Sequence, residues 1–331
     1  MCKRAGAVAL LATVLLGISF EAMGQWTWTP QTRRWINLKK LPKETPELQV
    51  EYARTLMIDG EYKKALRETN KFRNYYGDSA YADENQFVRG EIRLAQGNYK
   101  EAAKEFQQVI TGYPDTDRFQ DVIDKQYEIG DHLFERGQRR LSRGWWIPFR
   151  KRPFSAAIDV YRMVIDNQPF TDAAAEAQYK VGLCHYTLKE YVEAAYEYRR
   201  VIEDYAGSEW VDEAAYGLAV CYYDASLPPE YDQAPSLLAV AAIDDFKRRF
   251  PGDARVSELE PKRDEMRERV AQQRVRTAQF YEKRRKFDAA RICYEVVVEQ
   301  FSDTSAAEKA RAWLADHPKG MESELVSQAT L

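Results

Sequence analysis

The densest group of chemically distinctive residues lies between positions 138 and 152, where aromatic side chains stand among basic ones and no acid occurs. The residues predicted to act there are Arg143, Trp145, Trp146, Phe149, Arg150, Lys151 and Arg152. Tryptophan beside arginine suits a membrane interface with anionic headgroups, or an aromatic hot spot on a partner protein. In the alternative interpretation, the tryptophans fold back into the protein and only the cations are solvated. The sequence leaves both interpretations open.

Residues able to perform catalytic or redox chemistry are few. They are His132, His185, His317, Cys2, Cys184, Cys221 and Cys293. No His-Glu-x-x-His or Cys-x-x-Cys spacing occurs, and neither a glycine-rich phosphate loop nor a Gly-x-Ser-x-Gly elbow is present. We therefore predict a non-enzymatic protein that needs no cofactor and no metal. An unrecognised hydrolase is the alternative, and it would depend on one of the histidines or on a carboxylate pair.

The overall charge is nearly balanced. The 331 residues include 49 Lys and Arg and 52 Asp and Glu, a formal net charge of −3. A dedicated nucleic-acid binder is usually strongly basic, so no nucleic-acid partner is predicted. Beyond the N-terminus there is no long apolar run, which excludes a polytopic membrane protein. The expected partners are proteins.

Residues 1–24 have the pattern of an export signal. Basic residues at positions 3 and 4 precede an uncharged apolar stretch over 5–20, and Ala22 and Gly24 supply the small residues of a cleavage site. The apolar stretch is shorter than the roughly 20 residues that span a bilayer. Cleavage after Gly24 is therefore favoured over an uncleaved anchor.

A sequence repeat organises most of the chain. Residues 176–186 align with residues 213–223 at a shift of 37, and residues 60–65 align with residues 97–102 at the same shift. The pattern resembles the tetratricopeptide repeat, in which each unit is a pair of helices. About six degenerate pairs are predicted between residues 46 and 304. The predicted fold is an all-α solenoid, with a non-repetitive helical bundle as the alternative.

Small residues recur at equivalent positions of the predicted pairs. In the first helices they are Ala53, Gly90, Gly130, Gly182, Ala219 and Ala278, and in the second helices Ala65, Ala102, Ala157, Ala194, Ala239 and Ala290. Glycine or alanine lets two helix axes come close, so the helices of a pair are expected to cross at these positions. Tyr62, Tyr99, Tyr191 and Phe287 are predicted to fill the wedge beside each crossing.

Other segments depart from the repeat. Residues 25–45 begin with alternating Trp and Thr and are predicted to form a short extended arm or hairpin. Insertions are predicted near 138–152 and 227–234, and insertions in solenoids project as loops. Residues 305–317 are predicted to be a capping helix, and residues 318–331 a mobile tail.

Aromatic residues recur at outward positions of the predicted first helices. They are Phe87, Tyr127, Phe134, Tyr179, Tyr186, Tyr216 and Tyr223. Acidic residues, Glu84, Glu176 and Glu213, lie one turn before some of them. In repeats of this kind the first helices line the concave face, so the aromatic residues predict a groove for an extended peptide with aromatic anchors. Packing between successive repeats is the alternative.

The spacing of the later repeats resembles the BamD family of outer-membrane protein assembly factors. The residues that carry the resemblance are Ala239, Ile243, Phe246, Phe250 and Pro251, the segment 269–281, and Phe287, Ala290, Tyr294 and Phe301. The resemblance implies a periplasmic scaffold at the inner face of the outer membrane. It also implies docking of a BamA-like insertase through the C-terminal repeats, contact with other assembly-complex subunits, and acceptance of unfolded outer-membrane proteins at the N-terminal repeats.

One feature departs from the BamD pattern. Family members typically carry a lipobox cysteine at the cleavage site, whereas this sequence reads Ala22-Met23-Gly24-Gln25. Our hypothesis is that the insertion at 138–152 makes a peripheral membrane contact in place of a lipid anchor. The alternative function is a soluble periplasmic repeat adaptor for cell-wall, division or Tol-Pal-type envelope machinery.

Overall fold

The computed structural model describes residues 26–29, 34–37, 41–142 and 152–318. The predicted export signal, the centre of the 138–152 insertion and residues 319–331 of the predicted tail lie outside these ranges. Two strands come first: β1 (Trp26–Thr29) pairs antiparallel with β2 (Arg34–Asn37), and Trp28 stands opposite Trp35. The short hairpin predicted near the N-terminus is therefore present.

Over the described ranges the helices form six sequential pairs and one final helix. The pairs are α2 (Pro46–Ile58) with α3 (Tyr62–Tyr76), α4 (Ala82–Ala95) with α5 (Tyr99–Gly112), α6 (Phe119–Ser142) with α7 (Arg152–Asn167), α8 (Asp172–Thr187) with α9 (Tyr191–Asp204), α10 (Val211–Ala225) with α11 (Ala234–Arg249), and α12 (Val256–Lys283) with α13 (Phe287–Gln300). Helix α14 (Ser305–Asp316) follows them. Thr45, Thr171 and Thr304 cap α2, α8 and α14, because each side chain accepts a hydrogen bond from a backbone N–H of the first turn.

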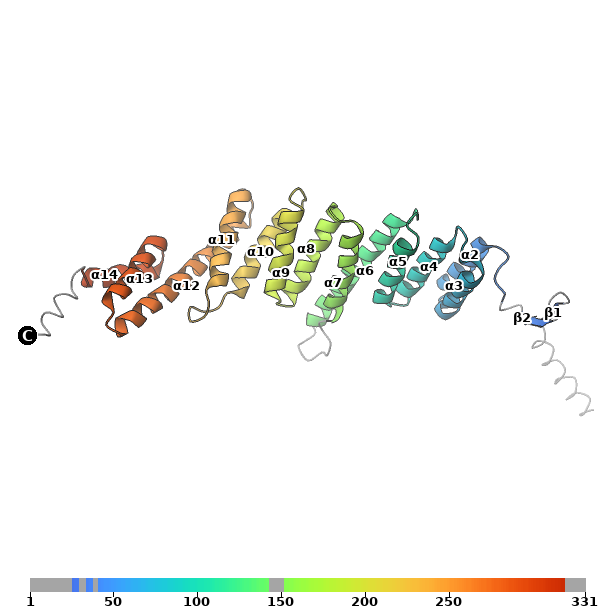
Figure 1. The fold of residues 1–331 in the computed structure, drawn as a ribbon, viewed down its shortest axis with the longest axis horizontal. Coiled ribbons are helices and arrows are strands. Elements are labelled where there is room, and N and C mark those ends of the chain that lie inside the picture. Colours follow the sequence, from blue (N-terminus) through green and yellow to red (C-terminus); the bar gives the residue numbers. More distant parts are fainter. Residues whose placement is uncertain (1–25, 30–33, 38–40, 143–151, 319–331) are drawn as a thin grey trace, which may run out of the picture. The chain divides into compact units, whose positions relative to one another are not determined.

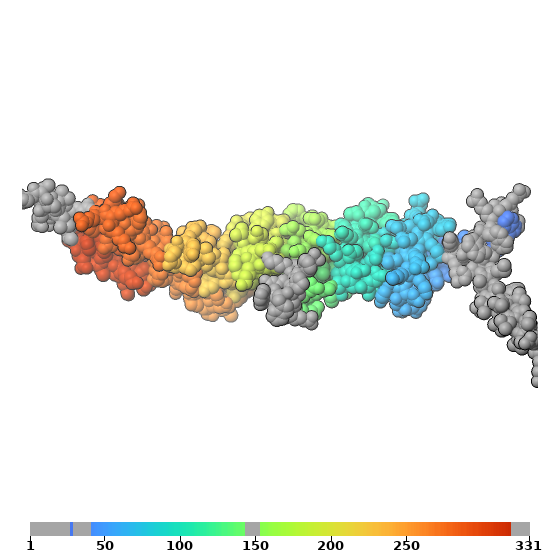
Figure 2. All heavy atoms as spheres, turned by 90° about the horizontal axis from the view of Figure 1, so that it is seen from below, coloured from blue at the N-terminus to red at the C-terminus, as the bar shows by residue number. Residues whose placement is uncertain are grey.

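The chain divides into two compact units, residues 1–125 and residues 126–331, and the division falls within α6. In the first unit each helix from α2 to α5 packs on the next one along the chain. In the second unit the same holds from α7 to α14, and α14 also packs on α12. Within each unit the colours of Figures 1 and 2 advance in chain order from helix to helix. Sequence neighbours are thus spatial neighbours, which confirms the predicted all-α solenoid.

The small residues of the repeat lie at the helix crossings, as predicted. All six second-helix alanines are fully buried, and so are Ala53, Ala219 and Ala278 of the first helices. The first-helix glycines face a large ring: a Cβ added to Gly90 would lie 2.5 Å from Phe106, and one added to Gly130 would lie 2.5 Å from Tyr161. The ring can occupy that space only because glycine has no side chain there.

The predicted wedge residues are not the side chains that fill the crossings of the second, third and fourth pairs. Tyr62, Tyr99, Tyr191 and Phe287 are the first residues of their helices and are only half-buried. The space beside the crossings of the second, third and fourth pairs is filled instead by Phe106, Tyr161 and Tyr198. Each of these follows the buried alanine of its helix by four residues, so it lies on the same helix face as that alanine. The first residue of each helix lies at the turn, and in the first pair Tyr62 packs against the buried cluster from there.

Gly90→Ala is expected to lower the free energy of unfolding by about 1–3 kcal/mol, since the new methyl group overlaps the buried Phe106 ring. Gly112→Ala is the matched control, because nothing lies within 4 Å of the added Cβ and the position ends a helix. That control should be neutral or gain about 0.5–1 kcal/mol. Denaturant unfolding of both variants measures the difference, and equal effects would contradict the close crossing.

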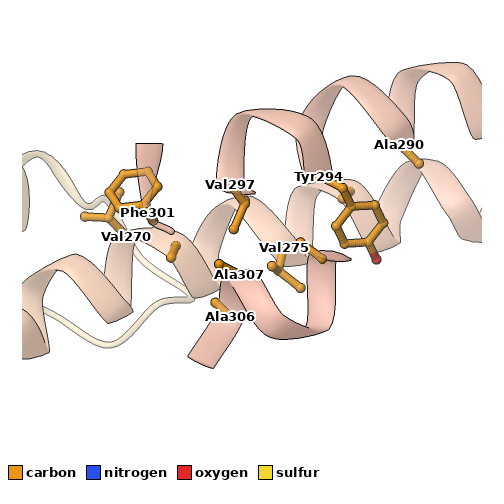
Figure 3. Packing of buried hydrophobic residues seen from close by; sticks show 11 residues of the cluster. Val270, Val275, Ala290, Tyr294, Val297, Phe301, Ala306 and Ala307 are labelled. Atoms are coloured by element: carbon orange, nitrogen blue, oxygen red, sulfur yellow. The ribbon is translucent and has the colours of Figure 1, made fainter. Parts of the chain in front are cut away.

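Two first helices are longer than a repeat requires. Helix α6 has 24 residues and runs to Ser142, so the predicted insertion at 138–152 begins inside a helix rather than as a loop. The helical face simply continues past Gly137, whose added Cβ would meet the buried Phe154 at 2.7 Å. Helix α12 has 28 residues and packs against both α13 and α14. Figure 3 shows their shared core, which includes Val275, Tyr294 and Ala307.

Candidate partner-binding surface

The first of the predicted groove residues, Phe87, belongs to the core of the first unit. It is 4% exposed, and its ring centroid lies 5.1 Å from that of Phe106. The Arg118 guanidinium covers the ring at 4.9 Å from its centroid. We correct the prediction for this residue, because no appreciable part of Phe87 is available to a ligand.

The other six predicted groove residues lie in the second unit, half-buried, and several join one first helix to the next. The Tyr127 hydroxyl of α6 donates to the Ala173 carbonyl oxygen of α8 at 3.2 Å. The Tyr186 hydroxyl of α8 donates to Asp224 Oδ2 of α10 at 2.7 Å. These hydrogen bonds connect helices of successive pairs.

Helices α10 and α12 are joined by two such bonds. Tyr216 donates to Glu258 Oε1 at 2.9 Å, and Tyr223 donates to Glu265 Oε2 at 2.7 Å. The two donors are seven residues apart on α10, and the two acceptors are seven residues apart on α12. Seven residues are close to two helical turns, so both bonds lie on one face of each helix. We call the four tyrosine bonds the tyrosine ladder: Tyr127, Tyr186, Tyr216 and Tyr223 with their acceptors.

The remaining two aromatic residues make ring contacts. Tyr179 stacks on Trp210 with centroids 5.2 Å apart, and Phe134 meets the buried Phe154 edge-on at 5.6 Å. The predicted alternative of packing between and within repeats therefore describes much of what these side chains do. All six side chains remain partly exposed, and their use by a peptide stays a prediction.

Cations cover three of the four tyrosine rings of the ladder. Lys180 Nζ lies 4.7 Å from the Tyr127 centroid, and Lys262 Nζ lies 5.7 Å from the Tyr223 centroid. The Arg255 guanidinium lies 5.2 Å from the centroid of Tyr216. Each cation comes from the next first helix or from the residue that caps it, so cation–π contacts reinforce the same joints.

The acidic residues predicted to line the groove are already paired. Glu176 lies 2.9 Å from Lys180, and Glu213 lies 3.0 Å from Arg255. In the first unit Glu84 pairs with both Arg54 and Arg118. These carboxylates neutralise cations of the protein itself.

The protonation states suit the ladder. Burial, together with the hydrogen bond to Glu258, raises the pKa of Tyr216 to about 12. Hydrogen bonds from Lys262 and Tyr216 lower the pKa of Glu258 below its ordinary value. At neutral pH the hydroxyl is thus a donor and the carboxylate an ionised acceptor, which is the stronger arrangement.

An apolar groove between α9 and α11 was missed by the sequence analysis. It is lined by Tyr191, Val192, Ala195, Tyr196, Arg199, Tyr222, Ala225, Pro235 and Leu238, and it encloses about 350 Å³. On α9, Val192 is 78% exposed and Tyr196 is 59% exposed. We call this feature the α9–α11 groove, and it is open on the surface of the second unit.

The groove can be recognised in the sequence when equivalent positions of the second helices are compared. The residues that follow the buried alanine of each second helix by two positions are Arg67, Lys104, Asp159, Tyr196, Ala241 and Ile292. The residues two positions before it are Lys63, Lys100, Ser155, Val192, Leu237 and Asp288. Among the six second helices, both positions are apolar or aromatic only in α9 and α11, and the groove lies between these two helices.

The cysteines and other metal-binding residue types form no site in the part of the chain that the structure describes. Cys184 and Cys221 are buried free thiols, and burial raises the pKa of Cys221 to about 12. Within the described ranges no three His, Cys, Asp or Glu side chains are grouped to hold a metal ion. Nor does any helix there combine the length and the apolar character needed to cross a bilayer.

Six of the seven residues predicted to form an insertion loop lie outside the described ranges. They are Arg143, Trp145, Trp146, Phe149, Arg150 and Lys151, while Arg152 is the first residue of α7. Their predicted role at a membrane or partner therefore stays a hypothesis.

Comparisons with known families agree with the helix pairs. A tetratricopeptide repeat model matches residues 84–116. The model of the YfiO family, described as outer membrane lipoprotein, matches residues 131–328, which is more than half of the chain. The chain belongs to the YfiO family. Because this family is BamD-like, the match supports the resemblance to BamD at the family level, and it marks the YfiO-family chain as a protein-interaction scaffold of the repeat class.

Solved repeat structures give fainter likenesses. The YfiO-family chain is 13% identical to a thermophilic tetratricopeptide repeat protein of Thermus thermophilus, with 67% of this chain and 98% of that one covered and a TM-score of 0.32. For part of a repeat protein from Cytophaga hutchinsonii the identity is 17%, the coverage 81% and 88%, and the TM-score 0.35. No curated protein matches the chain.

Proposed function

We propose that the chain is a non-enzymatic periplasmic scaffold for assembly and insertion of outer-membrane β-barrel proteins. It is exported with a cleaved signal and works at the inner face of the outer membrane, where it docks a BamA-like insertase and unfolded substrate segments. The observation that carries this proposal is the YfiO family match over residues 131–328. The solenoid supplies a surface for such docking, since each helix pair presents its own outward residues.

The α9–α11 groove is the proposed insertase contact. Its walls are apolar side chains that the fold leaves in water, and exposed apolar patches of this kind often mark protein interfaces. Arg199 lies in the wall and bonds the Tyr222 hydroxyl, so a charged group borders the apolar space. A partner with an apolar anchor and a nearby carboxylate fits this combination. The helix pairs of the first unit are assigned to unfolded substrate.

Photo-crosslinking from Leu238 in intact envelopes tests the proposal. We expect capture of a BamA-like barrel protein, and we expect Tyr196→Asp to reduce that capture about tenfold or more, since a buried aromatic anchor contributes about 1.4 kcal/mol or more. The matched control carries the photoreactive group at Lys104, which occupies the position in α5 equivalent to that of Tyr196 in α9 and is exposed. Lys104 should not capture the barrel protein.

Two outcomes would contradict this function. Recovery of only peptidoglycan-associated or division proteins from Leu238 would favour the alternative, a soluble periplasmic adaptor for cell-wall, division or Tol-Pal-type machinery. Equal capture of the barrel protein from Leu238 and Lys104 would show that the α9–α11 groove is not the contact.

A further inference from the structure

The turn between α12 and α13 concentrates positive charge. Lys283, Arg284, Arg285 and Lys286 are consecutive, and each side chain reaches solvent. We call these four residues the basic turn. The acidic residue just before them, Glu282, accepts a hydrogen bond from the Tyr294 hydroxyl of α13 at 3.3 Å. The core in Figure 3, which includes Tyr294, holds the two helices on either side of the turn.

None of the four cations forms an ion pair within the part of the chain that the structure describes. Cations earlier on the same helix behave differently. Lys262 lies 2.7 Å from Glu258, Arg263 lies 2.5 Å from Asp244, and Arg267 lies 2.6 Å from Asp303. Helix α12 therefore neutralises its charge near its start and leaves it uncompensated at its end.

The backbone fixes where these charges stand. Arg285 N donates to Glu282 O at 2.8 Å, and Lys286 N donates to Tyr281 O at 3.0 Å, so the chain reverses within the basic turn itself. Arg285 takes a left-handed conformation, with φ of 58°, to close the turn. The four long, exposed side chains are thus attached to a short backbone turn that hydrogen bonds hold in place.

An exposed aromatic ring accompanies the charges. Phe280 is 48% exposed, and the Arg284 guanidinium lies 4.1 Å from its ring centroid. Lys283 and Arg285 also border an open hollow of about 570 Å³, together with Gln279, Glu282 and Phe287. Cations beside an exposed aromatic ring are features of an interfacial membrane contact.

We propose that the basic turn, with Phe280, binds the surface of an anionic phospholipid membrane. This goes beyond the proposed function, which concerns protein partners. A lipid surface is favoured over an acidic protein because the four exposed cations stand beside an exposed aromatic ring, and a layer of phosphates accepts many arrangements of such charges. The family's outer-membrane description places such a surface within reach.

The expected strength follows from the charge. Each Lys or Arg near an anionic surface contributes about 1 kcal/mol, which is about fivefold in the partition coefficient. Removing three cations should therefore lower partitioning roughly 100-fold. Because the attraction is electrostatic, it should weaken at high salt, where the screening length falls to about 3 Å.

The test is sedimentation of the purified exported chain with vesicles of phosphatidylglycerol and phosphatidylcholine, and with vesicles of phosphatidylcholine alone. The variant carries Lys283→Gln, Arg285→Gln and Lys286→Gln. The matched control carries Lys63→Gln, Arg67→Gln and Lys104→Gln, which removes three cations that lie far from Phe280 in the sequence. Circular dichroism establishes that both variants keep the helical content of the unchanged chain.

We expect the turn variant to lose about 100-fold in partitioning to anionic vesicles and the control to lose less than about threefold. Phe280→Ser should weaken the binding that persists in high salt. The proposal is overturned if the folded turn variant partitions like the unchanged chain, or if vesicles with and without phosphatidylglycerol bind equally. It is also overturned if a photoreactive group at Arg284 captures an acidic protein and no lipid in envelopes, an outcome that would assign the turn to a protein partner.

Discussion

Tyr198→Ala is expected to lower the free energy of unfolding by about 3–5 kcal/mol. Tyr198 is 2% exposed and lies between two glycines of the neighbouring first helices. A Cβ added to Gly182 of α8 would lie 2.7 Å from its ring, and one added to Gly217 of α10 would lie 2.8 Å from the opposite ring edge. Truncation therefore opens a cavity that touches three helices at once. Denaturant unfolding followed by circular dichroism measures the loss.

Tyr196→Ala is the matched control for this prediction. It removes the same side chain from the same helix, but from a position that is 59% exposed in the α9–α11 groove. We expect a change in unfolding free energy within about 0.5 kcal/mol. A comparable loss in both variants would show that Tyr198 does not carry the packing of α8, α9 and α10.

Glu105→Ala is the second substitution with a large expected effect, about 3 kcal/mol or more of destabilisation. Arg89 is 8% exposed, and its Nε and Nη2 groups donate to the two Glu105 oxygens at 3.2 and 3.1 Å. The Nη1 group of Arg89 donates to Thr69 and Asn70. Without Glu105 the buried guanidinium keeps its charge but loses its counter-ion.

The same pair predicts a pH dependence. Burial alone would raise the pKa of Glu105, but the hydrogen bonds from Arg89 and Gln86 outweigh it and hold the pKa below the ordinary value of 4.5. A lowered folded-state pKa means that the carboxylate stabilises the protein above pH 4.5 and that this contribution disappears as the pH falls through the folded-state pKa.

The stability difference between the unchanged chain and Glu105→Ala should therefore be full at about pH 7 and shrink below about pH 4.5. Glu101→Ala, on the exposed side of the same helix, is the control and should cost less than about 0.5 kcal/mol at either pH. A difference for Glu105→Ala that stays constant down to about pH 3 would argue against the buried pair.

The solenoid could be predicted from the sequence because its determinants are local and repeated. Gly90, Gly130 and Gly182 recur at the crossings, and the alanine of each second helix recurs with them, so a one-dimensional pattern carries the packing. The identity of the rings that fill the crossings was not predicted. Tyr62 and Tyr99 each follow a turn glycine, Gly60 or Gly97, by two positions, so the repeat draws attention to the aromatic residue at the helix start. The helix geometry instead assigns the space to the residue four positions after the alanine.

The hydrogen bonds between successive helix pairs could not be predicted from the repeat pattern. Tyr186 donates to Asp224, which is 38 residues away in the sequence, and Tyr216 donates to Glu258, which is 42 residues away. The pattern within one repeat does not predict which hydroxyl pairs with which carboxylate. The groove residues were therefore predicted from their position in the repeat alone. Position alone does not distinguish the buried Phe87 from the half-buried tyrosines. The α9–α11 groove was within reach of the sequence, because Val192 and Tyr196 replace charged residues at positions that can be aligned.

The two bonds between α10 and α12 have a mechanical meaning. A single bond between two rods is a pivot, about which the rods can tilt, while two bonds spaced along both rods are a clamp. Tyr216–Glu258 and Tyr223–Glu265 are separated by about 10 Å along each axis, seven residues at about 1.5 Å per residue. The joint between α8 and α10 has one such bond, from Tyr186 to Asp224, supported by the Tyr179–Trp210 stack. Tilting of α12 about either of its two bonds would therefore break the other, whereas the joint between α8 and α10 resists bending through the buried Tyr198 ring held between Gly182 and Gly217.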